Sequence, residues 1–153
     1  MIDEPLDSGH EYEALLLGNQ LCFPLYAASR EITKHYKQLL DPLNLTYTQY
    51  LVMLVLWETD ALSVTELGKK LCLDSGTLTP VLKKLETKKF IQRLRDQADE
   101  RLLTIRLTNS GQRLKEQAKT IPAQIQEFLP LAEEELLLLQ RLSTKLVQSI
   151  SNN

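Results

Sequence analysis

Residues 63–107 read SVTELGKKLCLDSGTLTPVLKKLETKKFIQRLRDQADERLLTIRL, and in this segment two helical patterns are followed by two strand-like ones. The opening serine precedes an apolar run and Glu66 follows three residues later, the spacing of a helix capping box. Residues 74–89 repeat apolar side chains every three or four positions, which predicts a second helix. Residues 90–94 and 102–107 alternate like strands on either side of a polar loop, which predicts a hairpin.

Helical patterns continue on the N-terminal side of this segment. Thr46 or Thr48 can cap a helix that runs through Trp57, because a threonine hydroxyl can accept a hydrogen bond from the first turn. An earlier and longer helical pattern ends at Asp41, since the residue before a proline is disfavoured in a helix. Three short helices followed by a hairpin is the order of a winged helix-turn-helix.

Long helices are expected at both ends of the chain. Thr108 is placed to cap a helix to about residue 128, and Pro130 separates it from a last helix over residues 132–150. The long helices carry more apolar surface than one small module can cover, and such surface is usually buried against a second copy. The sequence therefore predicts a mainly α fold with a small β-hairpin wing, a winged helix-turn-helix with long N- and C-terminal dimerisation helices.

Length and composition limit the class of protein. A chain of 153 residues with 43% hydrophobic and 25% charged residues fits a single, largely helical domain. Residues 136–139 form an aliphatic run, but no window of the chain approaches the roughly 18 apolar residues that span a bilayer. The amino terminus is acidic and lacks the basic start of a signal peptide. We therefore expect a cytoplasmic protein with no membrane contact.

Cysteine and histidine are too few for a structural framework. Neither Cys22 nor Cys72 stands at a zinc-ligand spacing from His10 or His35. The two cysteines are also too far apart in the chain to suggest a disulfide scaffold. We therefore expect no bound metal and no other cofactor.

Charge is distributed unevenly along the chain. The net charge is −2, which by itself argues against a nucleic-acid binder. Residues 74–107, however, hold eight Lys and Arg against five Asp and Glu, a local charge of +3, which leaves −5 for the rest. Because charges are screened beyond a Debye length of about 8 Å, this locally basic module can still bind phosphates.

The helix predicted over residues 74–89 turns small hydroxyl residues and lysines away from its apolar face. Such side chains at the amino end of a helix can enter the major groove of DNA and bond bases and phosphates. The alternative is an ordinary amphipathic helix with a solvated face. The candidate DNA-binding residues on this face are Ser75, Gly76, Thr77, Thr79, Pro80, Lys83 and Lys84.

Arginines flank the tip of the predicted hairpin. Arg93, Arg95 and Arg101 lie around an acidic loop, and an arginine at the end of a wing can reach a narrow minor groove. Asp99 lies two residues before Arg101, so we expect it to hold that guanidinium in a bidentate pair. Arg95, Asp99 and Arg101 are therefore further DNA-binding candidates, and a surface hairpin of mixed charge is the alternative.

Cys22 lies near the expected start of the first long helix. If Asn19 caps this helix, Cys22 occupies its third position, where free backbone N–H groups and the helix dipole favour a thiolate. Pro24 supports a helix start nearby, because proline is best tolerated in the first turn. The alternative is a small core residue without reactivity.

Three stretches resemble the organic hydroperoxide resistance regulators of the MarR family: residues 19–23 (NQLCF), 43–51 (LNLTYTQYL) and 73–86 (LDSGTLTPVLKKLE). The wing motif DER at residues 99–101 also matches. The similarity covers roughly residues 15–122, and together these motifs are specific.

The resemblance implies a single MarR-type domain over residues 1–153 that forms a homodimer on a palindromic double-stranded DNA operator. Residues 11–41 and 109–153 then form the dimerisation helices, and residues 46–107 form the winged DNA-binding lobe. The two recognition helices of such a dimer must reach half-sites about 34 Å apart.

The resemblance also implies a redox sensor rather than an enzyme. The cysteine that matches Cys22 is oxidised by organic hydroperoxides to a sulfenic acid, which lifts repression, and tyrosines that match Tyr36 and Tyr47 hydrogen-bond the reduced sulfur. Cys22 and Tyr36 lie 14 residues apart on one helix, about 21 Å at the helical rise. A contact between them must therefore come from the partner subunit.

One departure from the family concerns a second cysteine. Some members carry a resolving cysteine near the C-terminal helices, but position 127 is Glu127 and no cysteine follows Cys72. We expect Cys72 to be a core residue of the helix-turn-helix. Cys22 should then act alone, its sulfenic acid being trapped by a small thiol or oxidised further.

Two other functions stay open at this point. A MarR-type repressor released by a small aromatic ligand needs a pocket lined by aromatic side chains, although aromatic residues at helical spacing are more often core. A thiol peroxidase needs a route for reductant, and no CxxC motif or acid–base pair accompanies Cys22. The aromatic candidates for the ligand pocket are Tyr26, Tyr36, Tyr47, Tyr50 and Trp57.

Overall fold

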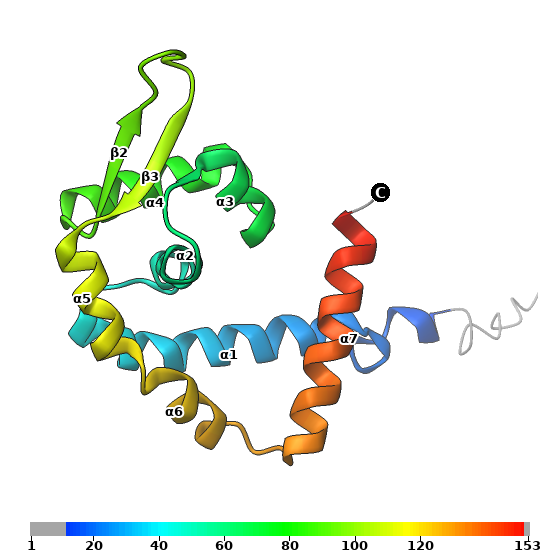
Figure 1. The fold of residues 1–153 in the computed structure, drawn as a ribbon. Coiled ribbons are helices and arrows are strands. Elements are labelled where there is room, and N and C mark those ends of the chain that lie inside the picture. The colour runs from blue at the N-terminus through cyan, green and yellow to red at the C-terminus, as the bar shows by residue number, and fades with distance from the viewer. Residues whose placement is uncertain (1–11, 152–153) are drawn as a thin grey trace, which may run out of the picture.

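Helix α2 (Tyr47–Glu58) runs through the middle of the winged lobe, and the other elements of that lobe surround it (Figure 1). The structure is a computed structural model that describes residues 12–151, so the outermost ends of the two predicted dimerisation segments lie outside the described residues. The described elements, with η for a 3₁₀ helix, are η1 (Glu13–Leu15), η2 (Leu17–Asn19), α1 (Cys22–Leu40), η3 (Asp41–Leu43), α2 (Tyr47–Glu58), β1 (Leu62–Ser63), α3 (Val64–Leu71), α4 (Ser75–Thr87), β2 (Ile91–Arg95), β3 (Leu103–Leu107), α5 (Asn109–Ala118), α6 (Ile121–Phe128) and α7 (Glu133–Ser151).

Capping boxes begin α2 and α3 where the sequence pattern predicts them. On α2 the cap is Thr46 rather than Thr48: the Thr46 hydroxyl accepts from the Gln49 N–H, and the Gln49 side chain accepts from the Thr46 N–H. Ser63 and Glu66 form the same reciprocal pair on α3. Each box satisfies N–H groups that a helix start leaves without a partner, a contribution of about 1 kcal/mol per cap.

The predicted hairpin is present, and a short third strand joins it. β2 and β3 pair antiparallel, beginning with Ile91 opposite Leu107, and stand up from the lobe as a wing (Figure 1). β1 lies along the other edge of β3 with Leu62 opposite Ile105, so the strand order is β1-β3-β2. The sequence did not indicate β1, because two residues are too few to show an alternating pattern.

The core of the lobe forms where α2 meets α4 and the sheet. α2 is apolar over most of its circumference, and a helix of that kind must be covered on all sides. Three leucines of α4 pack into this core, and each fully buried leucine contributes about 1.5–3 kcal/mol. The fully buried apolar side chains of α2, α4 and the sheet are Val52, Met53, Leu56, Leu78, Leu82, Leu85, Ile91 and Ile105.

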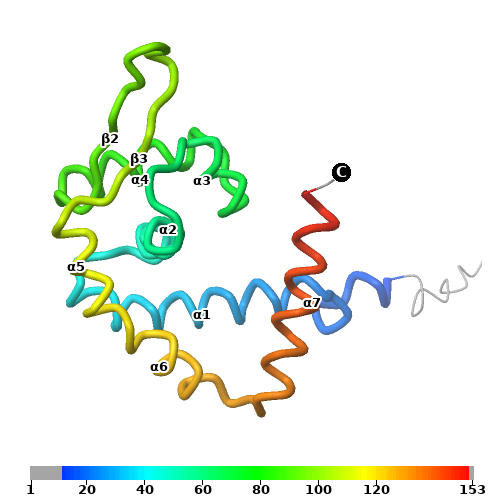
Figure 2. Tube along the Cα trace, in the orientation of Figure 1, coloured from blue at the N-terminus to red at the C-terminus, as the bar shows by residue number. Residues whose placement is uncertain are grey.

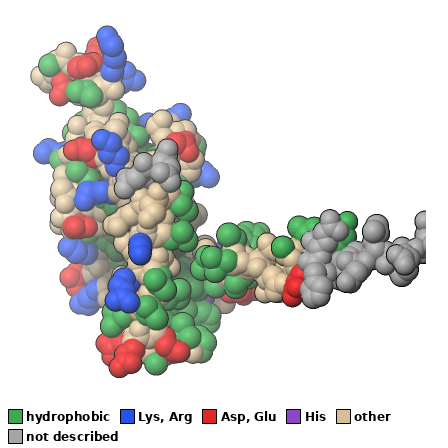
Figure 3. Space-filling model, turned by 90° about the vertical axis from the view of Figure 1, so that its right-hand side faces the viewer, with side chains coloured by type: hydrophobic (Ala, Val, Ile, Leu, Met, Phe, Trp, Pro, Cys, Tyr) green, Lys and Arg blue, Asp and Glu red, His purple; other side chains and the backbone are tan. Residues whose placement is uncertain are grey.

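The long helices extend beyond the lobe. α1 and α6 pack side by side beneath it, whereas α7 stands apart (Figures 1 and 2). Large apolar side chains remain exposed on α7 and on the N-terminal turns, including Leu15, Leu137 and Ile150. Figure 3 shows apolar side chains gathered along one side of the molecule. Soluble monomers seldom expose so much contiguous apolar surface, so this face is suited to a partner.

Two predicted helix boundaries are wrong. The single helix expected after Thr108 is divided into α5, capped by the Thr108 hydroxyl, and α6. Pro122 lies in the first turn of α6, and because proline lacks the N–H that a continuous helix would use there, the helix restarts. Asn19 does not cap α1: its side chain donates to the Glu13 carbonyl within the preceding turns, and α1 begins at Cys22.

The packing of α5 against the sheet can be tested at Gly111. A Cβ at this position would overlap the backbone carbonyl of Phe90. Gly111→Ala should therefore displace α5 and lower the free energy of unfolding by about 1–3 kcal/mol, the usual range for overpacking. Urea or thermal unfolding measures the change. Gly18→Ala is the matched control, because nothing lies within 4 Å of a Cβ at Gly18, and equal stability of the two variants would contradict the packing.

Candidate nucleic-acid interface and cysteine site

α3 and α4 form the helix-turn-helix, and a short turn fixes the angle between them. Cys72 ends α3 in a left-handed conformation with φ 54°, and the Leu73 N–H donates to the Gly68 carbonyl at 3.0 Å. Asp74 then caps α4, its Oδ1 accepting from the Thr77 N–H at 2.8 Å. The hydrogen bond from the Thr77 N–H, and secondly one from the Thr77 hydroxyl, hold the pKa of Asp74 below its usual range. The turn therefore presents the amino end of α4 in one defined direction.

The outer face of α4 is available to a ligand. The Thr79 hydroxyl donates to the Ser75 carbonyl and the Thr77 hydroxyl to Asp74, so each keeps lone pairs that can accept from a base. The ammonium groups of Lys83 and Lys84 lie further along the same exposed face. All seven predicted residues of this face are exposed: Ser75, Gly76, Thr77, Thr79, Pro80, Lys83 and Lys84.

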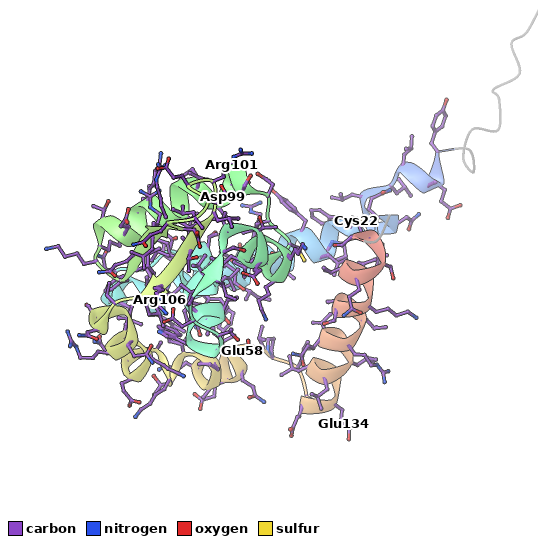
Figure 4. The ribbon with its side chains drawn as sticks, turned by 45° about the horizontal axis from the view of Figure 1, so that its top comes forward. Cys22, Glu58, Asp99, Arg101, Arg106 and Glu134 are labelled. Atoms are coloured by element: carbon purple, nitrogen blue, oxygen red, sulfur yellow. The ribbon has the colours of Figure 1, made fainter. Side chains whose placement is uncertain are left out.

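Two aspartates shape the tip of the wing. Asp96 accepts from the N–H groups of Ala98 and Asp99, and Asp99 Oδ1 accepts from the Arg101 N–H at 3.0 Å. The predicted bidentate pair is wrong: Arg101 Nε approaches one Asp99 oxygen only, at 3.9 Å, because the backbone of the turn already occupies that carboxylate. The Arg101 side chain is 94% exposed at the tip (Figure 4), and Arg95, the last residue of β2, is also exposed. Both guanidinium groups can therefore reach beyond the protein.

Arg93 anchors the wing to α4. Glu86 Oε2 lies 2.7 Å from both Arg93 Nε and Nη2, and Glu86 Oε1 accepts from the Arg93 N–H at 3.1 Å. The side-chain hydrogen bond from Arg93 holds the pKa of Glu86 below its usual range. Charge-assisted hydrogen bonds to both the backbone and the side chain of one residue fix geometry as well as distance. Sequence reasoning missed the pair, because its partners belong to a helix and a strand whose relative position only the fold defines.

Cys22 is the first residue of α1 and is exposed. Leu21 precedes it in a helical conformation and provides no side-chain cap, so the cysteine lies in the first turn, though not at the predicted third position. Leu21 and Phe23 are 74% and 44% exposed, so the thiol has apolar surface on both sides. Figure 4 shows Cys22 outside the lobe, far from Asp99 and Arg101 on the wing. A buried structural role within the single chain is excluded.

Tyr36 and Tyr47 meet near the other end of α1. Their ring centroids are 4.6 Å apart, and Tyr50 lies 5.9 Å from Tyr36. Burial, together with the two neighbouring tyrosines, raises the pKa of Tyr36 to about 12, and burial also raises the pKa of Tyr47. Both hydroxyls therefore stay protonated and can donate at neutral pH. The structure joins the tyrosines to each other but not to Cys22 of the same chain, about 21 Å along the helix.

Cys72 is exposed, so its predicted place in the core is wrong. The left-handed conformation at the end of α3 directs its side chain away from the helix packing. The thiol lines a surface cavity of about 490 Å³ together with residues that include Lys69 and Asp74. A sequence pattern of apolar residues cannot reveal that Cys72 is exposed, because its exposure depends on a single backbone angle.

The aromatic residues considered for a ligand pocket do not share one cavity. Tyr26 and Tyr47 line a cavity of about 850 Å³ beside α1. Tyr50 and Trp57 line another of about 300 Å³ between α2 and α5, and Trp57 Nε1 donates to the Gly111 carbonyl at 2.9 Å. The aromatic set is therefore divided between separate surfaces.

Within residues 12–151, no group of three or more His, Cys, Asp or Glu is arranged to hold a metal ion. His35 instead stacks on Phe128 with ring centroids 3.7 Å apart, and His10 lies outside the described residues. No helix in the same range is long and apolar enough to cross a membrane.

Known proteins share this architecture. A family model described as transcriptional regulator SarA/Rot matches residues 34–118. An organic hydroperoxide resistance transcriptional regulator of Bacillus subtilis is 53% identical over 116 residues, covering 76% of this chain and 79% of that protein. The chain belongs to the MarR family of transcriptional regulators, of the organic hydroperoxide resistance type.

Solved structures of MarR-type regulators have the same fold. Reduced AbfR bound to DNA matches with a TM-score of 0.79 at 37% identity, over 93% of this chain and 97% of that one, and AbfR is a protein of Staphylococcus epidermidis. AbfR with a disulfide formed matches with a TM-score of 0.61 at 36% identity, over 95% and 97% of the two chains. The predicted MarR family and the predicted winged helix-turn-helix fold are confirmed.

The link between α4 and the wing depends on the charge of Glu86. Because its pKa is lower in the folded protein than the ordinary 4.5, its stabilisation is fully present above that value and is lost as pH falls through the folded-state pKa. Glu86→Gln should therefore be less stable than wild type at neutral pH, and the difference in unfolding free energy should shrink as the pH falls below about 4.5. Glu100→Gln, at the exposed wing tip, is the control and should show little difference. A Glu86→Gln deficit that is constant with pH would disprove the ionic role.

Proposed function

We propose that this MarR-type chain is a redox-sensing repressor, which binds a palindromic operator as a homodimer and leaves it when organic hydroperoxides oxidise Cys22. The proposal is carried by the joint presence, in one chain, of an exposed helix-and-wing surface and an exposed cysteine at a helix start. The similarity to a hydroperoxide resistance regulator supports the class of oxidant. AbfR, described in a reduced DNA-bound form and in a disulfide form, supports the link between thiol chemistry and DNA.

The winged lobe, residues 46–107, offers two kinds of contact to DNA. We assign the outer face of α4 to the major groove, with its hydroxyl groups on base edges and Lys83 and Lys84 on phosphates. We assign Arg95 and Arg101 to the adjacent minor groove, since a narrow minor groove attracts arginine. Asp99 contributes by shaping the turn that carries Arg101, through the backbone hydrogen bond at 3.0 Å.

A homodimer follows from the apolar surface that one chain leaves uncovered. The exposed leucines of α7 and the N-terminal turns lie within residues 11–41 and 109–153, which we propose as the dimerisation segments of a single domain. Two lobes related by a two-fold axis match the symmetry of a palindromic operator. The distance between their recognition helices then decides whether both can reach half-sites about 34 Å apart.

The sensing chemistry is a two-electron oxidation of sulfur. The Cys22 thiolate attacks the terminal peroxide oxygen, an S–O bond forms as the O–O bond breaks, and the leaving alkoxide takes a proton to become the alcohol. In the proposed dimer the partner's Tyr36 and the partner's Tyr47 donate hydrogen bonds to the reduced sulfur. Oxidation adds a hydroxyl group to the sulfur, which changes its size and its hydrogen bonds, so the two redox states have different interface energies.

The surroundings of Cys22 favour organic oxidants. The neighbouring Leu21, Phe23 and Leu25 are exposed and offer apolar contact to the organic group of a hydroperoxide. We propose that each subunit is oxidised once as a signal and does not turn over as an enzyme. We also place its action in the cytoplasm, where a bacterial operator lies.

Replacement of Cys22 separates DNA binding from sensing. Cys22→Ser should bind the operator like the reduced wild type and should not respond to oxidant, because a hydroxyl cannot form a sulfenic acid. Operator Kd is measured at fixed salt before and after one equivalent of cumene hydroperoxide, and the wild-type affinity should fall by about tenfold or more. Cys72→Ser is the matched control and should respond like wild type. Equal responses of wild type and Cys22→Ser would place the sensor elsewhere.

Removal of the wing arginine tests the assigned DNA contact. Arg101→Ala should weaken operator binding by roughly tenfold and reduce its dependence on salt, because one cation that displaces counterions is lost. Arg113→Ala removes the same charge from an exposed arginine of α5, a helix that packs on α2 and β3 and carries none of the assigned DNA contacts, and should change binding by less than about twofold. Equal losses in the two variants would show that only net charge matters.

A further inference from the structure

Lys88 connects the end of the recognition helix to a distant part of the chain. It is the residue that ends α4, and its Nζ donates to the Asn44 carbonyl at 2.7 Å and to Gln49 Oε1 at 2.8 Å. The acceptors lie 44 and 39 residues earlier in the chain. Burial, and secondly the charge of Lys84, lowers the pKa of Lys88, which is consistent with an ammonium group turned into the protein rather than toward solvent.

The two acceptors belong to one hydrogen-bonded unit, residues 44–49, which we call the α1–α2 corner. Asn44 ends η3 in a left-handed conformation with φ 56°, and its carbonyl points to Lys88. Gln49 is only 2% exposed, and its Oε1 accepts from both Lys88 and the Thr46 N–H. The capping box of α2 and the lysine of α4 therefore share a single oxygen atom.

The same corner carries one of the sensor tyrosines. Tyr47 is the first residue of α2 and lies between Thr46 and Gln49 in the chain. Its ring packs on Tyr36 of α1 with centroids 4.6 Å apart. A displacement of Tyr47 therefore moves the capping box to which Lys88 is bonded. Figure 1 shows how α1, α2 and α4 succeed one another from the base of the lobe toward the wing.

The other connection between α2 and α4 is apolar. Met53 of α2 and the buried leucines of α4 belong to the common core, and such contacts attract without direction. Close packing fixes which face of α4 is buried, but it does so through many weak contacts rather than at one defined distance. Hydrogen bonds from a charged group hold distance and orientation together, so a movement at the corner is passed on to the end of α4.

We propose that Lys88 is a positioning residue that couples the redox state of the Cys22 site to the orientation of the recognition helix, through Asn44 and Gln49. This role rests on the proposed redox function. It is a role in regulation, distinct from DNA contact, since the ammonium group is engaged by acceptors of the protein itself.

The test compares the effect of oxidation on operator affinity in three proteins. Operator Kd is measured at fixed salt for the reduced and the cumene hydroperoxide-oxidised forms of wild type, Lys88→Met and Lys89→Met. Lys88→Met keeps the aliphatic stem and removes the donor, whereas Lys89→Met removes the same charge from the exposed neighbour. Lys89→Met should keep the wild-type ratio of oxidised to reduced Kd. In Lys88→Met that ratio should fall to about threefold or less, from the roughly 5- to 150-fold typical of coupled sites.

Two further measurements distinguish coupling from a general structural role. The rate of Cys22 oxidation should be unchanged in Lys88→Met, because the ring contact of Tyr36 and Tyr47, in which Lys88 takes no part, still holds the hydroxyls proposed to face the partner's thiol. Lys88→Arg, whose guanidinium can donate to both acceptors, should restore the ratio to within about twofold of wild type. Thermal unfolding identifies the folded variants. If Lys88→Met does not fold, Lys88→Leu, whose side chain also lacks a donor, replaces it with the same expected loss.

The outcomes separate this proposal from the function on which it rests. If wild-type affinity does not change on oxidation, the redox function is overturned and the coupling role with it. If the wild type responds and the folded Lys88 variant keeps the same ratio, the coupling role alone is overturned. A loss of ratio that Lys89→Met shows equally would also overturn it, because the effect would then be one of charge.

Discussion

The position of α4 is the constraint on which the DNA-binding lobe depends. Its leucines are buried against α2, and that burial holds α4 in the core and determines which of its faces is exposed. Two charged contacts at its carboxyl end add defined distances: Glu86 holds Arg93 of β2, and Lys88 holds the α1–α2 corner. The last turn of α4 therefore holds both the wing and the α1–α2 corner. The orientation of a recognition helix held in this way follows the positions of the wing and of the α1–α2 corner.

The lobe and the long helices differ in how much of their apolar surface is buried within one chain. The lobe has a closed core, reciprocal caps and a sheet whose wing is tied to α4, so its folding is complete within one subunit. The N-terminal turns and α7 leave leucines such as Leu137 and Leu142 in contact with solvent. Apolar surface in contact with water is unfavourable, and its burial against a partner would lower the free energy. The proposed dimer thus places the sensing cysteine among the parts of the chain that are completed by the partner.

Distance within α1 is the reason why the proposed sensing site requires two chains. Tyr36 and Tyr47 form a buried pair whose raised pKa values keep the hydroxyls as donors, while Cys22 lies at the other end of the same rigid helix. A helix cannot fold back to join its own ends, so one chain holds the thiol and the donors apart. In the proposed arrangement, each chain supplies a thiol to its partner and receives donors from it. A change at either thiol then acts on the relation between the two lobes.

The local features of this protein were determined by the sequence alone. The capping box of Ser63 and Glu66, the hairpin, the exposed face of α4 and the end of α1 at Asp41 and Pro42 each depend on residues a few positions apart, and the structure has them as predicted. The winged helix-turn-helix fold and the MarR family followed from their order and from short motifs.

Only the tertiary structure decided the features that join distant residues or depend on a single backbone angle. The strand β1 exists because β3 offers it an edge, and Lys88 meets Gln49 because α4 packs on α2. Cys72 is exposed because one left-handed residue ends α3. Hydrogen bonds within a turn join residues a few positions apart, so residue spacing predicts them. Contacts across the fold depend on how whole helices pack against one another. No periodic pattern in the chain carries that information.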